Sequence, residues 1–294
     1  MGTVVNLLVG GTRGTDARMN AQRTAVHRAA EWFRQIERSC NRFDSNSEVR
    51  LLATCAGTAV AVSPTLFEAV RFALAVAEDT DGAFDPTIGQ HMETLGFTRD
   101  YRSGADCGSR LATSASTSFR DVELHTESQS ITLHQPLLLD LGAVAKGLAI
   151  DMAARELHPF ENFLIDAGGD VYAGGETPNG GPWAIGIRHP RETDRLLRTV
   201  HVSGVAVCTS GDYERRSPTT GQHHIVHAAT RSGANMVSSA TVLAQSAMVA
   251  DALATAAFSL GPDAGLDLLQ RHEIEGLIVT ASLQECATPG MPRD

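Results

Sequence analysis

Predicted strands and long amphipathic helices occur in this chain without strict alternation, and this mixture constrains the fold most. Apolar residues recur at helical spacing from Asp16 to Cys40, and Ser63-Pro64 begins a second helix that runs to about Ala77. Two short apolar runs, Val122 to Leu124 and Ile131 to Leu133, are typical of a β-hairpin. The mixture of hairpins and helices predicts an α+β fold.

The rest of the chain continues this mixture. Pro136 to Leu141 predicts a buried strand, and Ala143 to Leu157 predicts the helix after it. Segment 102–118 is rich in Ser, Thr, Ala and Gly, which indicates a surface loop or small insertion. We expect residues 1–294 to form a single domain of one or two lobes. The other predicted strands are Val4–Val9, Phe163–Asp166, Trp183–Arg188, Thr199–Val202, Val205–Cys208, Ile225–His227, Val237–Leu243 and Leu277–Thr280, and the other predicted helices are Ser246–Leu260 and Asp263–Arg271.

Charge and composition exclude several classes of function. The 24 basic residues against 34 acidic ones give a net charge of −10, which argues against binding to nucleic acid or to an anionic membrane. The uncharged run from Gly233 to Ala250 is too polar for a membrane span. The N-terminus shows no basic and apolar leader, and five scattered cysteines form no C-x-x-C pair. We therefore expect a cytoplasmic protein without disulfides or a thiolate zinc site.

The segment from Asp140 to Gly147 combines a carboxylate, a Gly-containing turn and Lys146, which is the one lysine of the chain. A lysine and free amides in the first turn of a helix form an anion site that suits phosphate. The P-loop and G-x-G-x-x-G spacings are absent. A plain strand-to-helix turn with a capping Asp and a surface Lys is the alternative.

A second pair of functional candidates lies in the apolar segment Ala250 to Ala256. Asp251 and Thr255 are four residues apart, so both oxygens project from one face of the helix. A carboxylate on a buried helix is costly unless it is hydrogen-bonded or binds a cation. Carboxylate and hydroxyl oxygens favour Mg²⁺ over zinc. The alternative is an Asp that caps a neighbouring loop.

Three further segments carry weaker signals. The turn Gly82 to Thr87 places Phe84 where it could lie against a flat ring and Asp85 where it could accept hydrogen bonds, although, taken alone, the segment is better explained as an ordinary tight turn with a packed Phe. Small residues at Thr209 to Glu214 could bring amides to an anion. His223-His224 could serve as a base or metal ligand, or be structural.

Taken in order along the chain, these segments resemble the FAD:protein FMN transferases, the ApbE family of flavin transferases. The resemblance covers almost the whole chain. The matching segments are Met1-Gly-Thr, Asn41 to Glu48, Asp81 to Gly89, Asp140 to Asp151, Asp166 to Asp170, Pro182 to Ile187, Thr209 to Arg215, His224-Ile225, and Thr241 to Gly261.

The resemblance implies an α+β fold related to the T-fold and a Mg²⁺-dependent enzyme. Such an enzyme splits the FAD diphosphate, transfers FMN to a Ser or Thr hydroxyl of an acceptor flavoprotein and releases AMP. Some relatives hydrolyse FAD to FMN and AMP instead, and a weakly catalytic FAD-binding protein is a third reading. The residues implied are Asp251, Thr255 and the carbonyl of Ala143 for the metal, Met1, Phe43, Ala83, Phe84, Asp85, Asp140, Lys146 and Ile225 for FAD, and His224 for proton transfer.

The chain departs from the family pattern at two places. The pattern H-I-x-D-P-x-T-G has His227 and Ala228 here in place of Asp and Pro. The Ser-Glu-x-x-x-x-Asn element ends in Ala53 instead of Asn. Both departures lie near the expected active site, so they bear on whether the chain transfers FMN, hydrolyses FAD or only binds it.

Overall fold

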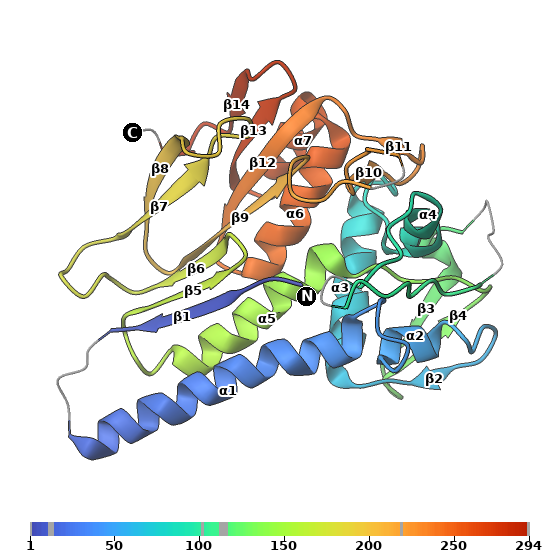
Figure 1. Cartoon of the computed structure of the whole chain (residues 1–294), viewed down its shortest axis with the longest axis horizontal. Helices are drawn as coiled ribbons and strands as arrows, with labels where there is room; N and C mark the ends of the chain where they lie inside the picture. The colour runs from blue at the N-terminus through green and yellow to red at the C-terminus, as the bar shows by residue number, and fades with distance from the viewer. Residues whose placement is uncertain (1, 11–14, 101–102, 112–116, 218–219, 293–294) are drawn as a thin grey trace.

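The computed structural model describes residues 2–10, 15–100, 103–111, 117–217 and 220–292. Within these residues, seven strands form one antiparallel sheet in the order β1-β5-β6-β9-β12-β13-β14 (Figure 1). The strands are β1 (Val5–Val9), β5 (Phe163–Ala167), β6 (Asp170–Gly174), β9 (Val205–Gly211), β12 (Val237–Ala244), β13 (Glu275–Thr280) and β14 (Glu285–Ala287).

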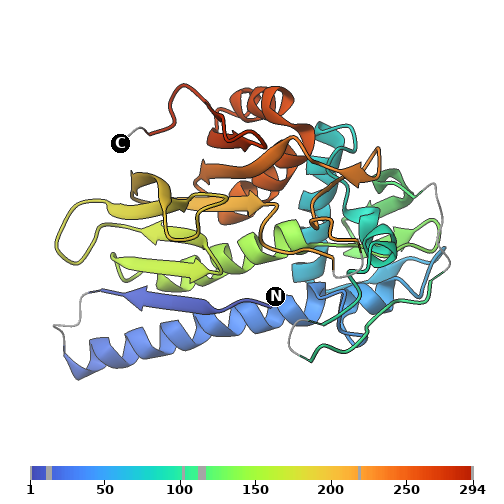
Figure 2. The same ribbon diagram turned by 45° about the horizontal axis from the view of Figure 1, so that its top comes forward.

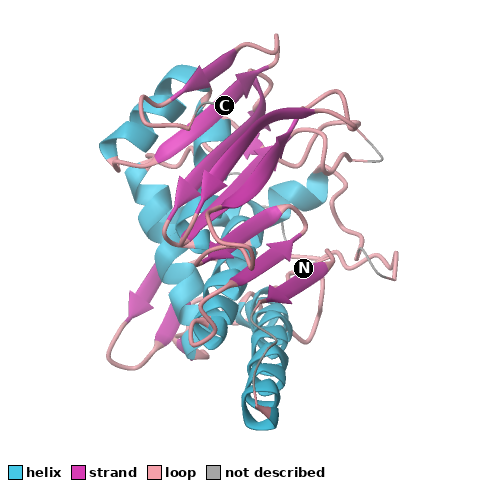
Figure 3. Cartoon of the chain, turned by 90° about the vertical axis from the view of Figure 1, so that its left-hand side faces the viewer, coloured by secondary structure: helices cyan, strands magenta, loops and turns pink. Residues whose placement is uncertain are grey.

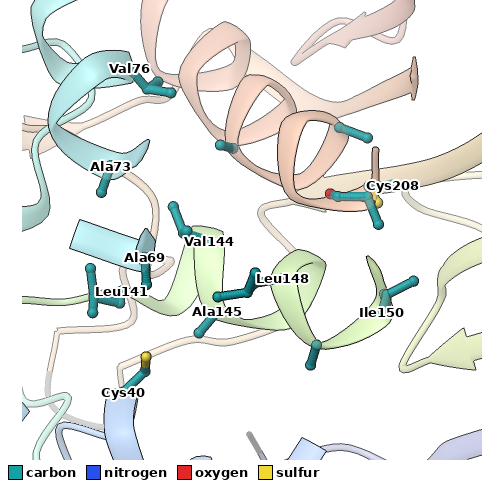
Figure 4. Close-up of a cluster of buried hydrophobic side chains, with 14 of the residues drawn as sticks. Cys40, Ala69, Ala73, Val76, Leu141, Val144, Ala145, Leu148, Ile150 and Cys208 are labelled. Atoms are coloured by element: carbon teal, nitrogen blue, oxygen red, sulfur yellow. The ribbon is translucent and has the colours of Figure 1, made fainter. Parts of the chain in front are cut away.

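Long helices cover one face of this sheet, as Figure 3 shows. α5 (Gly142–Leu157) and α6 (Ala247–Leu260) cross against each other, and α1 (Asp16–Cys40) lies along α5 (Figure 2). α3 (Pro64–Asp79) and α7 (Pro262–Arg271) complete the layer. Apolar side chains from these helices pack with those of the sheet in the main core. The core residues labelled in Figure 4 are Cys40, Ala69, Ala73, Val76, Leu141, Val144, Ala145, Leu148, Ile150 and Cys208.

The opposite face of the sheet is covered by a hairpin. β7 (Trp183–Arg188) pairs with β8 (Leu196–Val202), and their inward side chains pack with those of β9, β12 and β13 in a second core. Trp183 is buried, and its indole N–H donates to the carbonyl of Gly174 at 3.2 Å. The buried donor is thereby satisfied, so this hairpin belongs to the fold rather than to a mobile flap.

A group of shorter elements lies at one end of the helical layer. β2 (Val60–Ala61), β4 (Ser130–Leu133) and β3 (Val122–His125) form a small sheet beside α3, as labelled in Figure 1. The remaining short elements are α2 (Glu48–Leu52), η1 (Pro86–Ile88), α4 (Gly89–Thr94), η2 (Phe119–Asp121), β10 (Val226–His227) and β11 (Ser232–Gly233). They surround the end of α5 that carries Lys146.

Most predicted elements are confirmed, and the α+β class with them. The strand predicted at Pro136 to Leu141 is wrong: its leucines are buried, but the segment joins no sheet in the described residues. Its backbone bonds go to the segment around the start of α4, since Gly89 N–H donates to Leu138 O at 3.1 Å and Asp140 N–H to Pro86 O at 2.7 Å. The segment therefore shares burial with a strand but has a different hydrogen-bond partner.

Some elements had no signal strong enough to predict. β6 follows β5 after Gly168 and Gly169, which both have positive φ and so form a tight turn. Segment 102–118 lies partly outside the described residues, and its assignment as a loop or insertion stays a prediction. Within the described ranges, no helix combines the length and apolar character that crossing a membrane requires.

Candidate active site

The contact between α5 and α6 brings together the predicted phosphate-binding and metal-binding residues. The ammonium of Lys146 pairs with Asp251 Oδ2 at 3.1 Å and with Asp170 Oδ2. The amide of Gly147 donates to Asp251 Oδ2 at 3.2 Å. Lys146 stands at the start of α5 and Asp251 near the start of α6, so helix packing builds this cluster from distant parts of the chain.

Asp251 is held as a buried carboxylate. Its side chain is 7% exposed, and burial raises the pKa of this group, although the Lys146 charge, the Gly147 amide and the Arg215 charge lower it. A buried carboxylate of this kind is stabilised by a bound cation. Lys146 supplies one positive charge to it in this structure.

The oxygen atoms near Asp251 fit Mg²⁺. Thr255 follows Asp251 by one turn of α6, and its hydroxyl is 2.9 Å from Ser210 Oγ, which leaves it acceptor capacity. Ala143 is four residues before Gly147 in α5, so its carbonyl lies in the same turn of the helix as the Gly147 amide, which donates to Asp251. No group of three or more His, Cys, Asp and Glu side chains converges on one point within the described residues. Mg²⁺, which binds few carboxylates and completes its shell with water and phosphate, matches this donor set.

The end of β9 contributes to the same cluster. Thr209 N–H donates to Asp170 Oδ1 at 2.9 Å, and Thr209 Oγ1 is 2.8 Å from Thr241 Oγ1. Asp212 accepts a forked pair of bonds from Arg191, at 2.7 and 2.8 Å. The predicted anion cradle at Thr209 to Glu214 thus has its Thr209 amide engaged by Asp170.

Asp140 precedes α5 and is fixed by a residue that the sequence did not single out. Arg42 Nε donates to Asp140 Oδ2 at 2.7 Å, and Gly142 N–H donates to Oδ1 at 2.9 Å. Burial raises the pKa of Asp140, but Arg42, Gly142 and Arg215 outweigh burial and leave it below its ordinary value. Arg42 itself is 6% exposed and also donates to Phe97 O at 2.9 Å. Arg42 lies just before Phe43 in one of the segments that match the family, and this position is the sequence signal that could have pointed to it.

Phe43 lies beside this ion pair. The guanidinium carbon of Arg42 is 4.0 Å from the centroid of the Phe43 ring, a cation–π contact. Phe43 is therefore joined through Arg42 to Asp140. Met1, another of the predicted FAD residues, lies outside the described residues.

The turn from Ala83 to Asp85 is buried. Phe84 is 7% exposed and belongs to the main core. Asp85 accepts bonds from Thr87 N at 2.8 Å, Thr87 Oγ1 at 2.7 Å and Phe119 N at 2.9 Å. Burial raises the pKa of Asp85, and these three donors lower it, with a net rise. Asp85 organises the turn, and its contact with flavin stays a prediction.

The segment with His224 and Ile225 packs on this turn. Ala228 N–H donates to Ala83 O at 3.0 Å, which ties the β10–β11 hairpin to the turn before α4. Ile225 is 4% exposed and joins the main core. The family pattern has proline at the position of Ala228, and proline has no N–H, so this departure allows a hydrogen bond that the usual residue could not make.

His224 is a neutral imidazole at pH 7. Burial, together with the Arg215 charge, lowers the pKa of His224 to about 4. Its backbone N–H donates to Arg215 O at 3.1 Å, while Nδ1 has no hydrogen-bond partner in the described residues. An imidazole of this kind can accept a proton.

The structure therefore arranges the predicted site residues in two groups. Lys146 and Asp251 meet at the α5–α6 contact, where Thr255 lies one turn along α6 from Asp251 and Ala143 lies in the first turn of α5. Ala83, Phe84, Asp85, His224 and Ile225 meet where the β10–β11 hairpin covers the buried turn. Asp140 links the two groups, because it precedes α5 and its amide donates to Pro86 O, next to the buried turn. The residues that the sequence did not single out are Arg42, which holds Asp140, and Arg215, whose charge lowers the pKa values of Asp140, Asp251 and His224.

Comparisons with known proteins match this chain over most of its length. The chain is 34% identical over 234 residues to a FAD:protein FMN transferase of Klebsiella pneumoniae, covering 75% of this chain and 71% of that protein. It is 33% identical over 276 residues to a FAD:protein FMN transferase of Treponema pallidum, covering 86% and 75%.

Solved structures give the same result for the fold. The ApbE protein of Thermotoga maritima superposes with a TM-score of 0.84 at 30% identity and covers 98% of this chain and 94% of that one. The flavin transferase ApbE of Vibrio cholerae gives a TM-score of 0.80 at 25% identity, with 98% and 94% covered. The predicted ApbE-like α+β architecture is confirmed. Because the model of the ApbE family also matches residues 1–278, the chain belongs to the ApbE family.

Proposed function

We propose that this protein transfers the FMN part of FAD to a Ser or Thr hydroxyl of an acceptor flavoprotein, with Mg²⁺ and with release of AMP. The observation that carries the proposal is the buried Asp251 carboxylate, which lies with Thr255 on one helix and pairs with Lys146 from another. Relatives named FAD:protein FMN transferase support the flavin chemistry.

The proposed metal ligands are Asp251, Thr255 and the carbonyl of Ala143. When bound there, Mg²⁺ supplies charge neutralisation for the diphosphate of FAD. Lys146 holds a positive charge beside the same site, and the chain carries no other lysine. Diphosphate cleavage needs such positioning and charge more than a strong covalent catalyst.

His224 is the proposed proton acceptor. In the transfer, the acceptor hydroxyl oxygen forms a bond to the FMN phosphorus, the bond from that phosphorus to the bridging oxygen breaks, and AMP leaves with that oxygen. The hydroxyl proton moves to the imidazole of His224, which the pKa of about 4 keeps neutral and able to accept it. The negative charge of bound substrate raises the affinity of this imidazole for a proton.

The proposed flavin contacts are Met1, Phe43, Ala83, Phe84, Asp85, Asp140 and Ile225. Asp85 and Asp140 already accept internal hydrogen bonds, so their first role is to fix the turn and the start of α5. Because the turn is already rigid, the backbone groups next to it lose little conformational entropy when the ligand binds.

The experiment is mass spectrometry of the protein incubated with FAD and Mg²⁺, with and without a Thr-containing acceptor domain. An acceptor that gains the mass of FMN, with AMP released in equal amount, supports the proposal. Free FMN and AMP beside an unmodified acceptor indicate hydrolysis of FAD, and intact FAD indicates a binding protein. Both of these outcomes contradict the transferase assignment.

Variants separate the metal site from general damage. Asp251→Ala is expected to abolish transfer, because it removes the proposed carboxylate ligand. Asp263→Ala, an exposed Asp in the first turn of α7, is the matched control and is expected to keep wild-type transfer. Unchanged transfer by Asp251→Ala would remove Asp251 from the mechanism.

A further inference from the structure

Asp170 is a buried carboxylate in contact with the active-site lysine, and the proposed reaction gives it no role. It begins β6 immediately after the Gly168-Gly169 turn and is 3% exposed. Its Oδ1 accepts the Thr209 amide at 2.9 Å, and its Oδ2 contacts the Lys146 ammonium. The backbone of β9 therefore fixes this carboxylate, which leaves it little freedom to follow Lys146.

Lys146 bridges two carboxylates in this structure. Its ammonium contacts Asp170 on one side and Asp251 at 3.1 Å on the other. These three groups carry two negative charges and one positive charge. A divalent cation placed at Asp251 would turn the local charge from −1 to +1, which suits a diphosphate ligand.

The lysine and a metal ion compete for the same oxygen. An ammonium at hydrogen-bond distance from Asp251 Oδ2 occupies one face of that oxygen and repels a second cation nearby. Binding of Mg²⁺ at Asp251 Oδ2 therefore requires Lys146 to give up this contact. Asp170 is the group that can keep the ammonium paired after the exchange, because it is already in contact with it.

We propose that Asp170 is a positioning residue that draws Lys146 away from Asp251 and so opens the cation site. In the metal-free protein, Lys146 serves as the counter-ion of Asp251. When a divalent cation takes its place, Asp170 retains the ammonium next to the site, where it faces the phosphate. The inference rests on the cation site of the proposed function and adds a residue to it.

The test is the affinity of the full-length, FAD-free protein for Mg²⁺, measured by isothermal titration calorimetry at fixed ionic strength. Lys146→Met removes the competing ammonium and is expected to tighten Mg²⁺ binding about tenfold. Asp170→Asn keeps an oxygen for the Thr209 amide but releases Lys146 to Asp251, so it is expected to weaken binding about fivefold. If Lys146 and Asp170 only supported the structure, both variants would bind Mg²⁺ more weakly than the wild type.

A double variant and a matched control sharpen the result. If Asp170 acts through Lys146, Asp170→Asn made in the Lys146→Met background changes the Mg²⁺ affinity much less than it does in the wild type. Asp166→Asn is the control, because Asp166 lies on the same β5–β6 hairpin and accepts the Gly169 amide at 2.9 Å. It is expected to leave the Mg²⁺ affinity unchanged.

Thermal unfolding gives a second readout. Without Mg²⁺, Lys146→Met is expected to unfold at a lower temperature than the wild type, because two buried carboxylates lose their counter-ion. Added Mg²⁺ is expected to raise the unfolding temperature of this variant more than that of the wild type. If Lys146→Met does not fold, Lys146→Gln replaces it with the same expected direction.

Opposite outcomes overturn the inference. The inference is wrong if Lys146→Met binds Mg²⁺ more weakly than the wild type, or if Asp170→Asn binds it more tightly. It is also wrong if the effects of the two changes are independent, or if neither the wild type nor Lys146→Met binds Mg²⁺. The transfer assay tests the proposed function separately. If FMN transfer is absent but the Mg²⁺ affinities shift as expected, only the transferase proposal is refuted. If transfer is normal but the affinities shift in the opposite direction, only the role of Asp170 is refuted.

Discussion

The guanidinium of Arg42 donates from Nε to Asp140 Oδ2 at 2.7 Å and thereby ties the residues after α1 to the start of α5. Arg42 is almost fully buried, and its Nη1 also donates to the carbonyl of Phe97. This ion pair sets the position of Asp140, two residues before the helix that carries Lys146. The geometry of the proposed phosphate side of the site therefore depends on a residue almost 100 positions earlier in the sequence.

Removing Arg42 is expected to destabilise the protein strongly. Arg42→Met leaves the carboxylate of Asp140 without its partner, at a cost of about 3–5 kcal/mol in the free energy of unfolding. Chemical denaturation measures this cost. Arg34→Met is the control, because Arg34 forms an exposed pair with Glu31 and its loss costs less than about 1 kcal/mol. Equal losses in the two variants would contradict a buried, specific role for Arg42.

His224 is expected to make stability depend on pH. Its pKa is lowered to about 4 in the folded protein by burial and by Arg215, while the unfolded chain has the ordinary value near 6.5. Between pH 4 and pH 6.5 the unfolded state binds more protons than the folded state. The contribution of neutral His224 to the free energy of unfolding is therefore complete above pH 6.5 and is lost as the pH falls toward 4. The loss is on the order of 3 kcal/mol.

His224→Gln is expected to flatten this part of the stability profile. The measurement is urea denaturation from pH 4 to 7.5, with the variant subtracted from the wild type. His201→Gln, at an exposed position of β8, serves as the control and keeps the wild-type profile. Parallel profiles for His224→Gln and the wild type would show that His224 is not buried as a neutral group.

Gly147 allows α5 and α6 to approach closely. A Cβ at this position would lie 2.5 Å from Met248 Cα and closer still to the Ala247 carbonyl oxygen. Gly147→Ala is therefore expected to cost about 1–3 kcal/mol, even though alanine favours the helix by about 1 kcal/mol. Gly108→Ala, whose Cβ would meet its nearest neighbour at 3.7 Å, is expected to change stability by less than about 0.5 kcal/mol. Thermal or chemical denaturation compares the two, and a neutral Gly147→Ala contradicts the close helix contact.

The hydrogen bond from Ala228 to Ala83 predicts the effect of restoring the family residue. Ala228→Pro removes the N–H that donates at 3.0 Å and is expected to cost about 1 kcal/mol or more. Ala228→Ser retains the N–H and is the control. Denaturation curves measure the difference, and hydrogen exchange of the β10–β11 hairpin locates it. Equal stability of the two variants would mean that this bond contributes nothing.

The local elements could be predicted because their signals are local. The apolar spacing of Asp16 to Cys40 and the Ser63-Pro64 start predict helices that the structure contains at nearly the same bounds. The short β6 after Gly168-Gly169 gave no such signal, since its residues follow a tight turn with no alternation of their own. The strand predicted at Pro136 to Leu141 failed for a related reason. Its apolar residues show burial, while the hydrogen-bond partner that distinguishes a strand lies elsewhere in the chain.

The residue types of the candidate site and their order along the chain follow from the sequence alone. The spacing of Asp251 and Thr255 puts both oxygens on one helix face, and Lys146 follows Asp140 at a helix start, whatever the rest of the fold does. Which of these residues meet is set by the packing of the folded chain. The pairing of Lys146 with Asp170 and Asp251, and of Arg42 with Asp140, joins segments that are far apart in the chain. Such pairs depend on how helices and strands pack to bury apolar surface, and local spacing carries no record of that packing.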